Sequence, residues 1–529
     1  MTDLQQTHTG RRRALLRRGL AFAAVLAAGL IFRCDHLTDW DSWDYAAQAM
    51  MGHSSDLCLG RWWFIAVMRA SYWVGSALFG LTLSDGWLAM QVTCAVAMAA
   101  AVVVGMAWTG RLTRSASAEV VFAAMVVMGP TIGIYTFSVM TEGLTLLMLS
   151  AALWAWELAV GGAGHRRLWA AAAGAAFGLA VSIREPVVLL GLWPILSCLI
   201  DRPARRWTLL ATAVGAAALT LGIGVIGAWA WYPWTDAGYL EGISKWAGQM
   251  ARERGMFPVS VAANLGWLAK FSFAAIPTAA LLIVPALAWS AFARRRWVWL
   301  ALSAAPLAIS LLMDHTLAVN ARHAIPLIWV LAPIAAGAWD CWSRRLAGRL
   351  RWPRLRLPAA AGVLLAANAV VLALGWTIIQ EEYFDYVRGV DRAYRALLRL
   401  PTDAAVVPGP GTPAAYFLRR LRVKDFDVIA SGWAWPEDPD RQFARRLAEG
   451  KQVFVYFDEE TWRRAARNSG EWRAIRQVMS RYRRGEWVGP LVRIRGLMTS
   501  SAAATEPTGP ARPPEPRGPA VSGAARPPS

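Results

Sequence analysis

The sequence predicts a polytopic all-α membrane protein that carries a small α/β domain at its C-terminal end. Hydrophobic residues make up 56% of the 529 residues, and the mean hydropathy is positive. The apolar residues fall into runs of about 17 to 25 with few charges, which is long enough to cross the hydrocarbon core as helices. From residue 380 onward the hydropathy drops and a soluble alternation of short strands and helices begins.

The order of the charged loops predicts the topology. The formal net charge is +20, and the Lys and Arg residues lie mostly in short loops, at every second connection, as the positive-inside rule requires. No basic patch is interleaved with aromatic residues on a soluble module, which argues against a nucleic-acid partner. We therefore expect a cytoplasmic basic N-terminus at residues 1–14 and a multi-pass protein in the inner (cytoplasmic) membrane. The abundance of Arg and Ala is typical of a high-GC bacterium.

Residues 15–379 are expected to form the transmembrane domain, with about eleven spans. The first span is uncleaved, because Arg33, Cys34 and Asp35 make a poor signal-peptidase site. The Trp-rich segment 62–83, which contains Arg69, is expected to form two short interfacial or re-entrant pieces rather than a crossing, because a crossing there would put the basic loops on alternating sides. The expected spans are 15–33, 87–109, 117–134, 143–160, 168–184, 186–200, 207–231, 272–293, 297–313, 324–340 and 358–378.

Residues 380–497 are expected to form an extracytoplasmic α/β domain, because an odd number of spans places them outside. Its strand-like runs are 404–407, 427–430 and 452–457. The turn at 408–413 resembles a phosphate-cradling loop, but Thr412 as N-cap and Pro413 at the first helical position also explain it. Residues 498–529, rich in Ala, Pro, Gly and Ser, predict a disordered tail.

The five cysteines predict neither a disulfide framework nor a zinc site, because no spacing suits metal ligation. We expect no cofactor and assign no metal ligand, while a divalent ion stays open. Cys34 and Cys58 bracket the first outer loop. Both a bridge between them and two separate thiols are compatible with the sequence.

Ionisable residues concentrate at the outer ends of the expected spans. Charges at membrane depth are costly, so such a concentration indicates a functional site built from helix ends. The residues at this level are Asp35, Asp39, Asp41, Asp44, Glu142, Arg184, Glu185, Asp314, His315, Arg322 and His323.

The segment 40–49 places Asp41, Asp44 and Tyr45 at i, i+3 and i+4, which is one face of a helix. Two carboxylates on one face are suited to acid/base work on an acceptor hydroxyl. The same spacing fits an Asp-capped interfacial helix anchored by Trp40 and Trp43. Spacing alone leaves both interpretations open.

Several short motifs resemble those of the GT-C glycosyltransferases, which use lipid-phosphate sugars and include protein mannosyltransferases and the aminoarabinose transferase acting on lipid A. The resemblance covers about residues 10–380. The motifs are the outer-loop Asp followed by an aromatic-rich helix, the Gly-Arg-Trp-Trp run at 60–63, Met-Thr-Glu-Gly at 140–143, Ser-Ile-Arg-Glu-Pro at 182–186 and Asn-Ala-Arg-His-Ala-Ile-Pro at 320–326.

This resemblance implies an inverting transferase with a polyprenyl-phosphate sugar donor and a lipid, glycan or protein acceptor. The family's first outer loop commonly reads Asp-Glu-x-x-Tyr, so Asp41 corresponds to the catalytic base and Tyr45 to the Tyr. Ser42 stands where the family has Glu, and Asp44, one turn on, is the residue that could compensate for it.

The departing lipid phosphate requires cations or hydrogen-bond donors, for which Arg184, Arg322 and His323 are the candidates. Arg184 could instead pair with its neighbour Glu185, and Arg322 could extend to lipid headgroups. Glu142 is expected either to bind sugar hydroxyls or to stabilise a helix start. These assignments remain alternatives at the level of sequence.

Two other functions are compatible with the sequence. A lipid or small-molecule transporter would use buried charges to gate a pathway, but its charges should lie near mid-membrane and on both sides, and no inverted repeat is visible. A catalytically silent scaffold of the same fold is suggested by the missing Glu at position 42.

Overall fold

In the computed structural model the chain forms two compact units. The membrane unit comprises residues 1–391 and 413–424, and the sheet unit comprises residues 392–412 and 425–529. The structure describes residues 2–34, 36–37, 40–52, 61–83, 85–127, 129–162, 164–200, 204–231, 244, 325–349, 356–376, 380, 384–429, 438–458 and 479–497.

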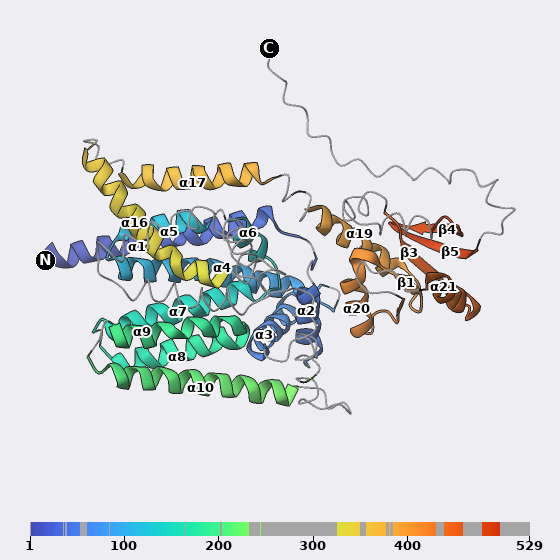
Figure 1. Ribbon diagram of the computed structural model, residues 1–529, viewed down its shortest axis with the longest axis horizontal. Coiled ribbons are helices and arrows are strands. Elements are labelled where there is room, and N and C mark those ends of the chain that lie inside the picture. Colours follow the sequence, from blue (N-terminus) through green and yellow to red (C-terminus); the bar gives the residue numbers. More distant parts are fainter. Residues whose placement is uncertain are drawn as a thin grey trace, which may run out of the picture. The chain divides into compact units, whose positions relative to one another are not determined.

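The membrane unit is a bundle of helices (Figure 1). Its described elements are α1 (Thr2–Ile31), α2 (Trp40–Met51), α3 (Trp62–Phe79), α4 (Trp87–Thr113), α5 (Ala116–Val126), α6 (Pro130–Thr136), α7 (Glu142–Val160), α8 (Arg166–Ile183), η1 (Glu185–Gly191), α9 (Leu192–Ile200), α10 (Arg206–Trp231), α16 (Ile325–Arg349) and α17 (Arg356–Leu374). Four of the described helices are long and apolar enough to cross a bilayer, namely residues 12–31 of α1 together with α4, α7 and α10. The expected spans at 272–293 and 297–313 lie outside the described residues, so the count of about eleven stays a prediction.

The expectation of two short pieces at 62–83 is wrong, because α3 is one continuous helix that ends at Gly80 in the left-handed conformation. The order of basic loops constrains which side each loop is on, but it does not require a break inside a helix. The charged side chain of Arg69 finds partners without a break in α3. Its guanidinium lies 4.6 Å from the centre of the Trp73 ring and donates to the carbonyl of Ala49 at 3.2 Å.

The expected span at 117–134 is divided into α5 and α6, and the one at 186–200 into η1 and α9. Proline explains the first break, because Pro130 lacks an N–H and its ring crowds the preceding turn. The break leaves carbonyl groups of α5 without helical partners. The side-chain amide of Asn368 in α17 donates to two of them, Ala124 at 2.9 Å and Met125 at 3.1 Å.

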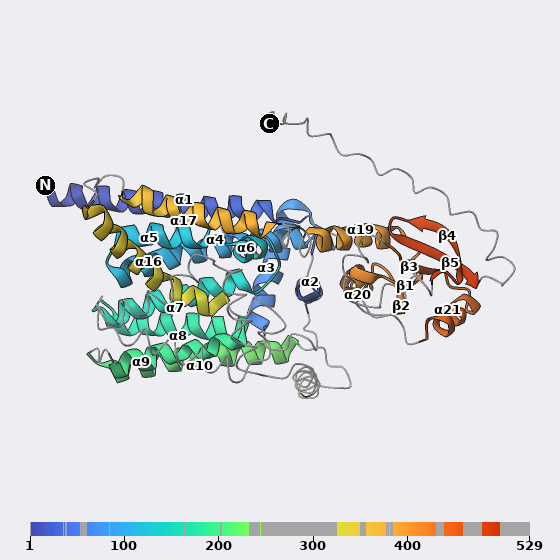
Figure 2. The ribbon, with the colours of Figure 1, turned by 45° about the horizontal axis from the view of Figure 1, so that its top comes forward.

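Helices α7, α8 and α10 lie side by side in that order (Figure 1, Figure 2). Small residues permit the close approach of α8 to α10: a Cβ added to Gly174 or Gly178 would meet the α10 backbone at Ala213 or Ala217. Elsewhere the core is aromatic and apolar. The fully buried Trp329 satisfies its indole N–H by donating to the Ser150 hydroxyl at 2.8 Å.

The sheet unit contains five strands in the order β2-β1-β3-β5-β4. They are β1 (Ala405–Val407), β2 (Asp427–Val428), β3 (Val453–Tyr456), β4 (Tyr482–Val488) and β5 (Leu491–Leu497). The first three are parallel and confirm the expected strands, while β5 pairs antiparallel with both β3 and β4. Strands β4 and β5 were not predicted, because arginines interrupt their apolar alternation. Their places are determined by pairing, β5 with β3 and β4 with β5.

Three helices accompany the strands in sequence: α19 (Asp385–Arg399), α20 (Thr412–Arg420) and α21 (Pro439–Ala448). Asp438 caps α21 by accepting from the backbone N–H of Arg441 at 3.1 Å. The expectation that Thr412 is the N-cap of α20 is wrong. Thr412 already has helical backbone angles, and its hydroxyl donates back to the carbonyl of Gly409 at 2.7 Å.

Candidate active site

The acidic and aromatic cluster from Asp41 to Tyr45 lies on α2, as its spacing predicts. Asp41 is half-buried in the first turn, and Tyr45 is completely buried. Trp43 is 1% exposed and packs edge-on against Trp87 with ring centres 6.0 Å apart. Trp43 therefore belongs to the protein core, which disfavours the alternative in which it anchors an interfacial helix.

Tyr45 links α2 to the start of α3. Its ring contacts Phe64 edge-on at 5.1 Å, and the guanidinium of Arg61 lies 5.6 Å from the ring centre. The phenolic hydroxyl is buried and has no hydrogen-bond partner within the described part of the chain. A buried hydroxyl without a partner is unfavourable in the protein alone, which makes Tyr45 a candidate for a polar contact with substrate.

Glu142 and Arg184, predicted independently as site residues, are brought together by the fold. Nη1 of Arg184 donates to Oε1 of Glu142 at 2.5 Å and to the hydroxyl of Thr141 at 3.3 Å. The alternative pairing of Arg184 with Glu185 is wrong. The backbone is extended at Arg184, so successive side chains point to opposite sides, and Glu185 instead faces Arg61 at 3.5 Å.

Arg61 is a further candidate residue, and it was not among those predicted from the sequence. Its side chain is 19% exposed and bridges Tyr45 on α2 and Glu185 at the start of η1. In the sequence Arg61 belongs to the Gly-Arg-Trp-Trp run at 60–63, one of the motifs that resemble the GT-C enzymes. An arginine directly before two tryptophans, at the start of an apolar helix, was the signal that could have identified it.

Both carboxylate oxygens of Asp44 accept hydrogen bonds. Oδ1 accepts from Nη1 of Arg420 and Oδ2 from the amide of Gln48, each at 2.5 Å. Arg420 comes from segment 413–424, which belongs to the membrane unit. Asp44 therefore joins α2 to segment 413–424 through its ion pair with Arg420.

Arg322 and His323 lie outside the described residues, as do Asp35, Asp39, Asp314 and His315. Cys58 does too, so the question of its pairing with Cys34 also falls outside the described residues. Across the ranges that the structure describes, no group of three His, Cys, Asp or Glu residues could hold a metal ion.

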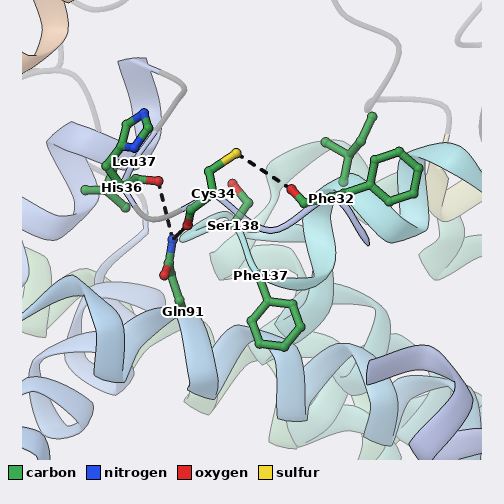
Figure 3. A pocket seen from close by; sticks show the side chains of 8 residues that line it. Phe32, Cys34, His36, Leu37, Gln91, Phe137 and Ser138 are labelled. Carbon is green, nitrogen blue, oxygen red and sulfur yellow. Dashed lines mark hydrogen bonds between the residues drawn. The ribbon is translucent and has the colours of Figure 1, made fainter. Parts of the chain in front are cut away.

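A small cavity lies beside the stretch that leads into α2 (Figure 3). Gln91 of α4 lines it, and its side-chain amide donates to the carbonyls of Cys34 at 3.3 Å and His36 at 3.4 Å. The His36 ring lies 3.5 Å from the carboxylate of Asp391. These contacts fix the backbone before α2 to the helix bundle. The contacts therefore support the candidate site, and the cavity beside them is not the site itself.

No family model and no curated protein sequence matches this chain. Solved structures do match it. ArnT from Cupriavidus metallidurans bound to undecaprenyl phosphate is 14% identical, with a TM-score of 0.56 over 91% of this chain and 97% of that one. The apo form of the same ArnT gives 16% identity and a TM-score of 0.54 over 92% and 98%.

A third structure, the archaeal oligosaccharyltransferase AglB from Archaeoglobus fulgidus in complex with an inhibitory peptide and a dolichol-phosphate, is 12% identical. Its TM-score is 0.53, over 92% of this chain and 74% of that one. ArnT and AglB are GT-C fold enzymes. The chain therefore has the GT-C fold, as the sequence motifs suggested.

Proposed function

We propose that this chain is an inverting GT-C glycosyltransferase that moves a sugar from a polyprenyl-phosphate donor to a lipid, glycan or protein acceptor. The observation that carries the proposal is the position of Asp41. It stands half-buried in the first turn of α2, three residues before Asp44, which pairs with Arg420, in a chain with the fold of an enzyme solved with undecaprenyl phosphate.

In this mechanism Asp41 takes the proton of the acceptor group as that group attacks the anomeric carbon of the sugar. The new glycosidic bond forms while the bond from the anomeric carbon to the phosphate oxygen breaks, and polyprenyl phosphate leaves. Attack from the face opposite the phosphate inverts the anomeric configuration. Asp44 holds the geometry of α2, and the Tyr45 hydroxyl contacts substrate.

The leaving phosphate gains negative charge, so it needs a cation nearby. Arg61 suits this role, because it is partly exposed and its carboxylate partner Glu185 is about half exposed. Arg184 contributes from a buried position, with its charge balanced by Glu142. We propose that Arg322 and His323 complete the set.

The proposed topology has a cytoplasmic N-terminus in a bacterial inner membrane. The site then lies at the outer face, with residues 15–379 as the catalytic membrane domain and 380–497 as an extracytoplasmic domain that selects the acceptor. The positive-inside pattern of the loops supports this orientation.

The test is transfer by the full chain in nanodiscs supplied with an undecaprenyl-phosphate sugar. Asp41→Asn should lower the transfer rate by on the order of 10²–10⁴-fold, the usual contribution of a general base, while folding and insertion stay unchanged. Asp403→Asn, at an exposed carboxylate of the sheet unit, is the matched control. Full transfer by Asp41→Asn would refute the assignment, and movement of the intact lipid without a new glycosidic bond would indicate a transporter.

A further inference from the structure

Segment 413–424 is unusual because its neighbours on both sides along the chain belong to the sheet unit, while the segment itself belongs to the membrane unit. It contains most of α20 and the turn that follows. Nothing in its composition predicts this, since Arg419, Arg420, Arg422 and Lys424 are typical of a solvated helix end. The contacts of two residues on α20 explain it.

Phe417 provides the apolar part of the contact. It is 3% exposed, and its ring packs edge-on against Trp43 at 4.8 Å and Trp87 at 6.0 Å. Edge-to-face aromatic pairs at these separations stabilise a contact beyond the area they bury. Three rings from α2, α4 and α20 therefore form one buried cluster.

Arg420 provides the polar part. It follows Phe417 by three residues, so both side chains lie on one face of α20. Its Nη1 lies 2.5 Å from Oδ1 of Asp44, the residue directly after Trp43, and the side chains of this ion pair are 25% and 9% exposed. Removal of one member of such a pair leaves the other charge desolvated and uncompensated.

We propose that Arg420 is a positioning residue of the active site. It holds Asp44, and through Asp44 it fixes the rotation of α2 that aims Asp41 at the acceptor. The catalytic consequence rests on the proposed transferase function, but the restraint on α2 does not. Arg69 restrains the opposite end of α2 through the Ala49 carbonyl, so the helix is held at two points by arginines from outside it.

Hydrogen exchange of the full chain in nanodiscs tests the restraint directly. In Arg420→Ala, amides of α2 (residues 40–51) should exchange about tenfold faster than in the wild type, because local opening becomes easier when a contact is lost. Arg419→Ala, at the exposed neighbour on the same helix, should leave α2 within about twofold of the wild type. Unchanged exchange of α2 in Arg420→Ala would overturn the proposal.

Transfer kinetics test the catalytic consequence. Arg420→Ala should lower kcat by about 10- to 100-fold, with the KM for the donor within about twofold, because misplacement of the base slows chemistry rather than binding. Arg420→Lys should restore most of the rate. The charge-reversed double variant Asp44→Arg with Arg420→Asp should restore the slow exchange of α2.

The two sets of measurements separate the two proposals. If the wild type transfers no sugar but α2 exchange responds to Arg420→Ala, the transferase function fails and the restraint stands. If Arg420→Ala loosens the whole membrane unit, Arg420→Lys decides. A lysine that restores protection throughout the unit, α2 included, while kcat stays low would overturn the positioning role.

Discussion

Arg184 donates through Nη1 to Oε1 of Glu142 at 2.5 Å, and the two side chains are 3% and 1% exposed. The pair joins the end of α8 to the start of α7. Two opposite charges buried together offset each other's desolvation, whereas either one alone would be a buried, uncompensated charge. The ion pair therefore fixes the end of α8 against the start of α7.

Arg184→Met should destabilise the folded protein by about 3–5 kcal/mol, because Glu142 would be left buried without its partner. The double variant Glu142→Leu with Arg184→Met should be more stable than Arg184→Met alone. Thermal unfolding in detergent across the double-mutant cycle measures the coupling. Strictly additive changes would show that the two residues do not act as a pair.

Tyr45→Phe should leave folding unharmed, because the phenolic hydroxyl has no partner within the described part of the chain. Transfer should nevertheless fall about tenfold, the value of one hydrogen bond to a neutral group. Rates of Tyr45→Phe are compared with those of Tyr72→Phe, which removes a hydroxyl from α3. Equal rates for both variants would exclude Tyr45 from the substrate contact.

Asn368→Leu should destabilise the membrane unit by about 1–3 kcal/mol, although leucine is the more apolar residue. The side-chain amide of Asn368 satisfies the buried carbonyls of Ala124 and Met125, and leucine would leave them without partners. Val370→Leu, at an exposed position of the same helix, is the control. A higher melting temperature for Asn368→Leu would contradict this account of the break between α5 and α6.

Asp427 should make the sheet unit sensitive to acid. Burial raises the pKa of this carboxyl, but hydrogen bonds and charges from Arg446 and Lys451 outweigh burial and hold the pKa below its ordinary value of 3.8. A lowered folded-state pKa stabilises the fold above the unfolded-state pKa, and this stabilisation is lost as the pH falls through the folded-state value.

The loss should therefore occur below about pH 4. Amide exchange of β2, corrected for the intrinsic rate at each pH, measures it. Asp427→Asn should be less protected at neutral pH and should lack this acid transition. An identical pH profile for the variant and the wild type would rule out the linkage.

Much of the helical framework was predictable. Helices α4, α7 and α10 begin and end within a few residues of the apolar runs, because a long helix in lipid is determined by local hydropathy. The helical spacing of Asp41, Asp44 and Tyr45 was predictable for the same local reason. A proline such as Pro130 is also a local signal for a helix break. The break there was not predicted, because the residues around Pro130 form a continuous apolar run.

The sequence by itself determined the class of protein, the helical face that carries Asp41, and the places of Glu142 and Arg184 at helix ends. Hydropathy, charge order and helical period are properties of neighbouring residues, so they are readable along the chain. Only the tertiary structure decided which charged side chains pair with each other. Asp44 and Arg420 are 376 positions apart, and no local pattern specifies which distant cation meets which carboxylate. That choice depends on how α2 and α20 pack, with Phe417 against Trp43 and Trp87.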